Sequence, residues 1–117
     1  MSIAANVVVA IVALLHVYFL VLEMFLWDKP AGLRAFGQTL EAARASKVLA
    51  ANQGLYNGFL AAGLGYGLVA ANLAFKVFFL ICVIVAGIYG AATANRRILL
   101  VQALPAALAL AAVLLAR

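Results

Sequence analysis

Four long apolar stretches, joined by short polar connections, make up most of the chain. They cover residues 3–27, 48–71, 75–94 and 98–116. At a rise of about 1.5 Å per residue, each helix of this length reaches across the hydrocarbon core of a bilayer, which is about 30 Å thick. The last two connections are tight turns, so neighbouring helices are expected to run antiparallel. The pattern predicts an all-α protein, a four-transmembrane-helix antiparallel bundle.

The connection at residues 28–47 is the long one. It opens with Asp28-Lys29-Pro30, and Pro30 is expected to stop the first helix because proline cannot continue its hydrogen bonding. Apolar residues then recur at helical spacing, at Leu33, Phe36, Leu40 and Ala43. This pattern is typical of a short amphipathic helix lying in the membrane interface between the first two spans.

Composition supports a membrane protein and excludes an ordinary soluble domain. Hydrophobic residues make up 70% of the chain, mean hydropathy is +1.23, and only 9% of residues are charged. Soluble proteins are about half apolar and about a quarter charged. A chain of 117 residues forms a single integral membrane domain, residues 1–117, and Cys82 stands alone, so no internal disulfide exists.

The basic residues indicate an orientation. The first and third connections carry Lys29, Arg34, Arg44, Lys47, Arg96 and Arg97, whereas the opposite side has Lys76 and Arg117. The positive-inside rule then places the first and third connections in the cytoplasm and both termini outside, in a multi-pass protein of the cell inner (plasma) membrane. The net charge of +5 is explained by topology and contacts with anionic lipid, so no nucleic-acid partner is expected.

Polar side chains inside the spans gather toward the cytoplasmic side. Glu23 lies one turn inside Trp27, about 6 Å along the helix. The residues expected at similar or slightly greater depth on the other spans are Asn52, Gln53, Tyr56, Asn57, Tyr89, Thr93 and Gln102. His16 is deeper, near the middle of the first span. Since buried polar groups are costly in lipid, this asymmetry predicts a polar pocket open toward the cytoplasmic half.

Ionisable groups within spans are usually functional, so Glu23 and His16 are the candidate catalytic acid or base residues. The amides, phenols and hydroxyl of the other spans are the candidate ligand-binding groups. Glu23 could instead snorkel to the interface, and the amides could be interhelical contacts without further function. No metal site or cofactor is expected, because His16 and Glu23 lie two turns apart and a third good ligand is missing.

Small residues frame the polar rows. Gly54 and Gly58 form a small-xxx-small pair on the second span, and Gly87 and Gly90, three residues apart, are expected to act similarly on the third. Such residues let helix backbones approach closely in lipid, and they also allow a homo-oligomer through glycine-rich faces. Pro105 in the fourth span is expected to produce a kink close to Gln102.

The chain resembles the small four-helix membrane proteins catalogued as domain of unknown function 1304. The resemblance covers nearly the whole chain and rests on His16 with Glu23-Met24 and Trp27, the run Asn52-Gln53-Gly54-Leu55-Tyr56-Asn57-Gly58-Phe59-Leu60-Ala61, Gly87-Ile88-Tyr89-Gly90 with Thr93, and Gln102 with Pro105-Ala106. It implies an integral membrane protein with four spans. No established activity and no catalytic role come with it.

Three classes of function stay open. The first is a binding protein or enzyme for a small lipophilic molecule that uses acid/base chemistry. The second is a proton-coupled small-molecule transporter, either monomeric or dimeric, and the third is a structural or accessory membrane subunit. The first class is favoured over transport, because the outer half of the spans offers few polar groups. The substrate and the choice between enzyme and binding protein stay open.

Overall fold

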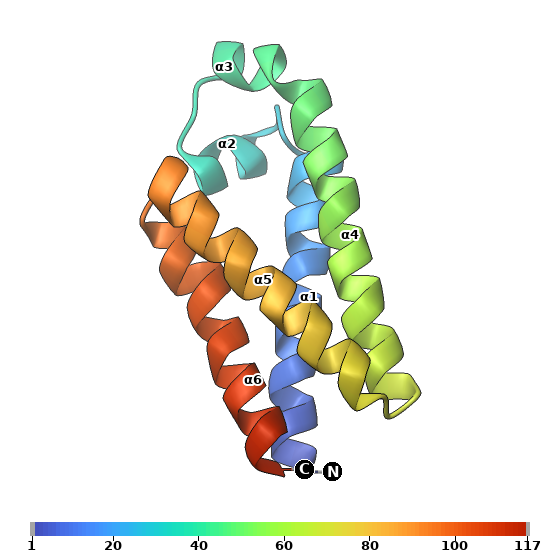
Figure 1. Cartoon of the computed structure of the whole chain (residues 1–117). Coiled ribbons are helices and arrows are strands. Elements are labelled where there is room, and N and C mark those ends of the chain that lie inside the picture. The colour runs from blue at the N-terminus through green and yellow to red at the C-terminus, as the bar shows by residue number, and fades with distance from the viewer. Residues whose placement is uncertain (1, 117) are drawn as a thin grey trace. The chain divides into compact units, whose positions relative to one another are not determined.

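The computed structural model describes residues 2–116, which form α-helices and one π-helical segment joined by turns (Figure 1). The long helices are α1 (Ile3–Met24), α4 (Lys47–Val69), α5 (Leu73–Thr93) and α6 (Leu104–Ala116), the last preceded by the π-helical segment η1 (Leu99–Ala103). The short helices α2 (Pro30–Phe36) and α3 (Leu40–Ala45) lie between α1 and α4. The predicted all-α class is confirmed.

Three helical stretches are long and apolar enough to cross a membrane: α1, α5, and the continuous stretch Leu99–Ala116 formed by η1 and α6. Helix α4 is the longest helix, yet it is not among these three. Its sequence holds Asn52, Gln53 and Asn57 together with several glycines, which lower its apolar character. The chain is therefore a multi-pass membrane protein with three candidate spans in the described residues and a fourth long helix of more polar composition.

The first helix ends earlier than predicted. Helix α1 stops at Met24, and the chain then turns, with the Leu26 N–H donating to the carbonyl of Val21 at 3.2 Å. Trp27 therefore lies in a turn. Gly32 of α2 packs against this turn so closely that a Cβ at Gly32 would lie 2.0 Å from the Leu26 carbonyl oxygen. The sequence pattern reveals neither the end of α1 at Met24 nor this backbone approach.

Proline has a different role from the predicted one. Pro30 does not terminate the first helix; it begins α2, where its missing N–H and fixed φ suit the first helical position. The single amphipathic helix predicted for this connection is also wrong. Gly37 ends α2 with a left-handed backbone (φ 60°), and Thr39 begins α3 by accepting a hydrogen bond from the Ala42 N–H at 3.1 Å. Helix-ending signals thus override the apolar spacing.

The described chain divides into two compact units. One contains α1 up to Leu14 and the chain from Leu60 onward, and the other is Leu15–Phe59. Helices α1 and α4 each contribute to both units. The first unit is called the α5–α6 unit below, and the second the connection unit.

The α5–α6 unit holds the apolar core. Helices α5 and α6 pack side by side and run in opposite directions (Figure 1). The buried core residues come from α1, α4, α5 and α6, and are Ala5, Val9, Val12, Ala13, Leu64, Leu80, Val83, Ala106, Ala109 and Val113. Alanine and valine predominate, which suits helices that associate in lipid by close van der Waals packing.

Helix α5 and segment η1 pack closely at Gly87. A Cβ at Gly87 would lie 2.7 Å from the backbone nitrogen of Ala103, so only glycine fits there. The Leu104 N–H donates to the carbonyl of Leu99, five residues earlier, which is the π-helical pattern. Pro105 follows directly and lacks an N–H, so the ordinary hydrogen bond to Val101 is missing. The kink predicted near Pro105 stays a prediction, and the π-helical segment lies directly before this part of α6.

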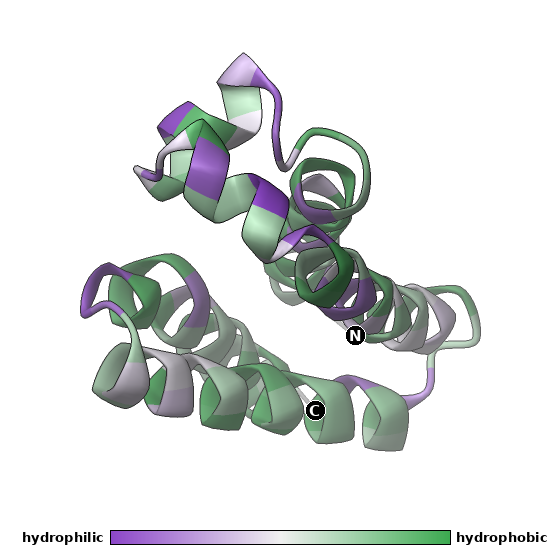
Figure 2. Cartoon of the chain, turned by 90° about the horizontal axis from the view of Figure 1, so that it is seen from above, coloured by the Kyte–Doolittle hydropathy of each residue, from purple (hydrophilic) through white to green (hydrophobic). Residues whose placement is uncertain are grey.

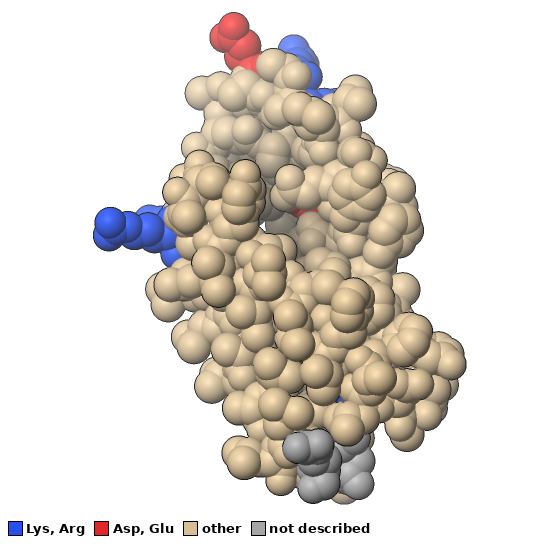
Figure 3. All heavy atoms as spheres, viewed as in Figure 1, with Lys and Arg blue, Asp and Glu red and all other residues tan. Residues whose placement is uncertain are grey.

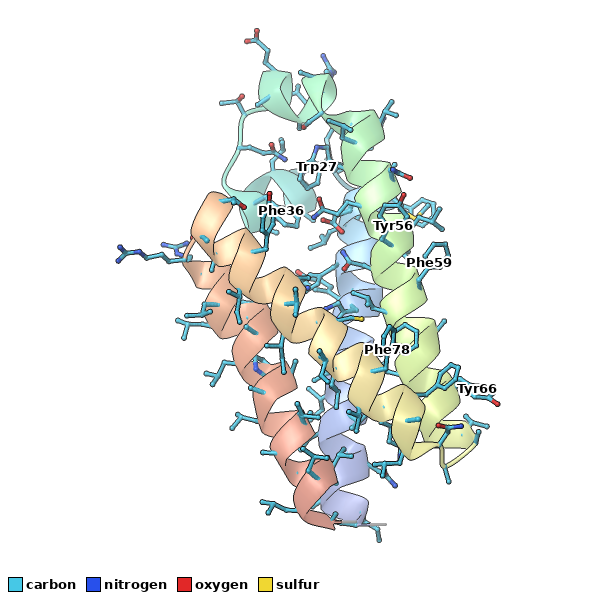
Figure 4. The ribbon with its side chains drawn as sticks, viewed as in Figure 1. Trp27, Phe36, Tyr56, Phe59, Tyr66 and Phe78 are labelled. Carbon is cyan, nitrogen blue, oxygen red and sulfur yellow. The ribbon has the colours of Figure 1, made fainter. Side chains whose placement is uncertain are left out.

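The connection unit is tied together by its aromatic and polar side chains. The Trp27 Nε1–H donates to Ser46 Oγ at 3.1 Å, and the Trp27 ring lies 4.8 Å from that of Phe36 (Figure 4). Lys47 Nζ lies 3.0 Å from Asp28 Oδ2. These contacts join the turn after α1 to the start of α4. They hold the two ends of the α2–α3 segment close together.

Polar residues are concentrated in the short helices and turns, and apolar residues predominate along the long helices (Figure 2). On the face shown in Figure 3, uncharged atoms cover most of the surface of the long helices. Charged side chains protrude over the α1–α4 connection and at the turn between α5 and η1. This distribution fits helices surrounded by lipid and connections in contact with water.

Candidate functional site

Glu23 lies at the centre of a polar cluster within the connection unit. Its side chain is 3% exposed, and it lies in the last turn of α1. Glu23 Oε2 accepts a hydrogen bond from Gln53 Nε2 at 2.8 Å, and Oε1 accepts one from Asn57 Nδ2 at 2.5 Å. Both carboxyl oxygens are therefore held by amides of α4. This set, Glu23, Gln53 and Asn57, is called the Glu23 cluster below.

Glycines on α4 bring the two helices close enough for these bonds. A Cβ at Gly54 would lie 2.6 Å from Met24 Cγ and 3.1 Å from Glu23 Cβ, and one at Gly58 would lie 2.7 Å from Leu20 Cδ1. The small-xxx-small pair identified in the sequence thus packs against α1 beside Glu23. Because Gln53 and Asn57 are one turn apart on the same face of α4, both amides reach the same carboxyl group.

The second polar row of α4 has a different environment. Asn52 is exposed, and Tyr56 is 55% exposed with its ring 5.9 Å from that of Phe59. Both aromatic side chains project from the same side of α4 (Figure 4). The two rows therefore separate, and Gln53 with Asn57 contacts Glu23 whereas Asn52 and Tyr56 lie at the surface.

His16 is fully buried on α1, two turns before Glu23. Its ring meets that of Phe19 edge to face, with centroids 5.4 Å apart and an interplanar angle of 75°. Within residues 2–116, no group of three His, Cys, Asp or Glu side chains is placed to hold a metal ion.

The remaining predicted site residues belong to the α5–α6 unit. Tyr89 is exposed, and the Thr93 hydroxyl donates to the Tyr89 carbonyl oxygen at 2.7 Å. Gln102 is half-buried within η1. That these three residues share a chamber with Glu23 stays a prediction.

Outside the Glu23 cluster, one ion pair lies at the surface of the described part of the connection unit. Among the described residues the salt bridge joins Lys47 to Asp28. The hydrogen bond from Lys47 lowers the pKa of the Asp28 carboxyl below its ordinary value of 3.8, and the positive charge of Lys47 lowers it further. Lys29, Arg34 and Arg44 are exposed.

The sequence interpretation missed a second buried charge. Lys76 of α5 is 0% exposed, and its Nζ donates to Asn6 Oδ1 of α1 at 3.0 Å. Sequence reasoning counted Lys76 as a basic residue at the outer membrane surface. A signal was present, because Lys76 shares one helical face with Leu80, Val83 and Gly87, the residues that α5 buries.

With this geometry described, comparison with known proteins places the chain in a family. The family described as "Protein of unknown function (DUF1304)" matches residues 10–114. The chain belongs to this family. It is also 35% identical over 114 residues to the uncharacterized protein YpaA of Lactococcus lactis subsp. lactis (strain IL1403), an alignment that covers 94% of this chain and 96% of that protein. No solved structure matches the chain.

Proposed function

We propose that this protein crosses the membrane four times and binds a small lipophilic molecule at the Glu23 cluster, with Glu23 exchanging a proton with its ligand. The supporting observation is the buried Glu23 carboxyl group, held on both oxygens by Gln53 and Asn57. An ionisable group in this setting is a functional candidate, because lipid makes it costly to keep without a use.

The length of α4 supports the fourth span. Its 23 residues measure about 34 Å, more than the hydrocarbon thickness. Two of its polar side chains hydrogen-bond to Glu23, which reduces the cost of placing them in lipid. With four spans, the six basic residues of the first and third connections lie in the cytoplasm, and the Glu23 cluster lies in the cytoplasmic half.

Reaction with dicyclohexylcarbodiimide, a lipid-soluble reagent for protonated carboxyl groups, tests proton exchange at Glu23. The chain has three acidic side chains, and Glu23 is the one buried within a long helix. We expect mass spectrometry of protein labelled in membranes to locate the adduct on Glu23, and Glu23→Gln to abolish it. Glu41→Gln, which changes an exposed side chain of α3, should label as the wild type does. An unlabelled Glu23 throughout the range from pH 5 to pH 8 would contradict the proposal.

Binding is tested by native mass spectrometry of the protein extracted from membranes. We expect a small-molecule adduct on the wild type that is lost in Glu23→Gln and Asn57→Leu, while helical content and elution volume stay unchanged. If both variants unfold, the cluster has a structural role, and the proposal is wrong. If reconstituted protein conducts protons and Glu23→Gln stops the flux, the protein is a transporter.

A further inference from the structure

The side chains that hydrogen-bond to Glu23 carry no charge. Its two hydrogen-bond partners, Gln53 and Asn57, are neutral amides. Among residues 2–116, the salt bridge joins Lys47 to Asp28, and it does not include Glu23. Amide donors hold a carboxylate in place but supply no opposite charge, and an uncompensated charge in an apolar region is costly. A cationic ligand would compensate the charge of the ionised Glu23 carboxylate.

The hydrogen-bonding groups of the cluster indicate which cation. Each amide donates through its nitrogen to Glu23, and each also carries a carbonyl oxygen that only accepts. The carboxylate oxygens can accept further hydrogen bonds beyond those from the amides. Each amide nitrogen keeps one further N–H, but the four side-chain oxygens of the cluster outnumber these two donors, so acceptors predominate. An alkylammonium group carries only donors and a positive charge, so it complements the cluster in both respects.

Metal ions and anions fit less well. The amide nitrogens face the carboxyl oxygens, so a metal ion placed among the three side chains would meet N–H groups instead of the oxygen ligands that hard cations require. An anion would be repelled by Glu23. A neutral alcohol could hydrogen-bond here but would leave the charge uncompensated.

The surroundings of the cluster define the rest of the ligand. Leu20 and Met24 of α1 pack against the α4 glycines next to Glu23. Gln53 is exposed, whereas Glu23 and Asn57 are buried, so Gln53 forms the outer edge of the cluster. A ligand that arrives at this edge from the bilayer needs an apolar body, with its charged end directed to the carboxyl group.

We propose that the Glu23 cluster binds a lipophilic primary or secondary ammonium ion, which forms an ion pair with Glu23 and donates hydrogen bonds to the amide oxygens of Gln53 and Asn57. This inference rests on the proposed function, since it assigns a ligand class to the same site. It adds that the positive charge of the ligand, and not only its apolar body, determines binding.

Three probes that share a ring and a two-carbon chain test the role of charge: 2-phenylethylamine, 2-phenylethanol and phenylacetate. At pH 7 an alkylamine is protonated. Binding to the purified full chain in detergent is followed by the fluorescence of Trp27, the single tryptophan, which lies four residues after Glu23 in the turn that follows α1. We expect saturable binding of the amine, and binding at least tenfold weaker for the alcohol and for the acid.

Variants separate the ammonium inference from the proposed function. Glu23→Gln should weaken amine binding at least tenfold, and Glu41→Gln should leave it unchanged. Gln53→Ala alters an exposed side chain, so we expect this variant to fold even where Glu23→Gln fails to fold. It should weaken amine binding about threefold.

Two outcomes overturn the inference. If the amine does not bind saturably, or binds Glu23→Gln as well as the wild type, no ion pair with Glu23 forms. If the alcohol binds as tightly as the amine and Glu23→Gln abolishes both, the charge is irrelevant and the ammonium assignment is wrong, while the proposed lipophilic site stands. Carbodiimide labelling tests the proposed function separately, because it uses none of these probes.

Discussion

Among residues 2–116, each of the two units contains one buried acidic or basic side chain, and the two have different surroundings. In the connection unit, Glu23 is held by two amides, one of which, Gln53, is exposed. In the α5–α6 unit, Lys76 is fully covered and donates to Asn6, which is half-buried. Both charges use amide partners from another helix. Only the Glu23 cluster has a member at the protein surface.

This difference shows that burial of a charge does not by itself define a site. Lys76 has its aliphatic stem against Gly67, where a Cβ would lie 2.9 Å from Lys76 Cγ and 3.1 Å from its backbone nitrogen. A ligand would have to displace packed helices to reach it. The Lys76–Asn6 pair therefore joins α1 to α5, whereas the Glu23 cluster reaches the protein surface at Gln53.

The largest expected effect tests the structural role of the Lys76–Asn6 pair. Asn6→Leu removes the acceptor of a buried ammonium group, and we expect a loss of about 2–3 kcal/mol in unfolding free energy, as for a hydrogen bond to a charged group. The measurement is reversible unfolding in mixed micelles, followed by circular dichroism.

The double variant Asn6→Leu/Lys76→Met is the control. Replacing both partners of a buried polar pair by apolar residues is often neutral, so most of the stability should return. A double variant as unstable as Asn6→Leu would show that the loss comes from altered packing at position 6 and not from the stranded lysine.

The glycines beside each charge give the next largest effect. Gly54→Ala and Gly67→Ala each place a methyl group within 3.0 Å of a side-chain atom, and both should lower the unfolding free energy by about 1–2 kcal/mol through overpacking. Gly65→Ala is the matched control on α4, because a Cβ there meets no atom within 4 Å. It should stabilise the helix by up to about 1 kcal/mol. Equal effects at all three positions would mean that close helix contact is unimportant in both units.

The smallest effect concerns the surface salt bridge of the connection unit. The pKa of Asp28 is lowered by its hydrogen bond to Lys47, so the pair stabilises the folded state above the ordinary value of 3.8, and this contribution is lost as pH falls through the lower folded-state pKa. The difference in unfolding temperature between the wild type and Asp28→Asn should be small at pH 6 and should disappear on acidification below pH 3.8. A difference that grows as the pH falls would contradict this assignment.

The sequence predicted the long helices well because apolar stretches of this length have few alternatives in a chain of this composition. It predicted the ends of the helices less well. Gly37 and Thr39 divide the predicted amphipathic helix, and Pro30 begins a helix instead of stopping one. Apolar spacing alone cannot resolve these details, because left-handed and capping conformations depend on single residues.

The candidate site, like the helices, could be predicted only in part from the sequence. The row of Gln53 and Asn57 and the row of Asn52 and Tyr56 are equivalent in the sequence, since each pairs residues one turn apart. Contact with α1 distinguishes them, and that contact depends on the rotation of α4 set by Gly54 and Gly58. The burial of Lys76 likewise required knowledge of which α5 face meets other helices.

Composition and spacing alone determined that this is a helical membrane protein with amides and a carboxyl group inside its long helices. Such polar groups stand out in a sequence because lipid restricts which backbone structures and side chains are tolerated. The tertiary structure decided which of these polar groups meet. Helix rotation and close contact at glycine select the partners of Glu23 and Lys76, and a one-dimensional pattern contains neither.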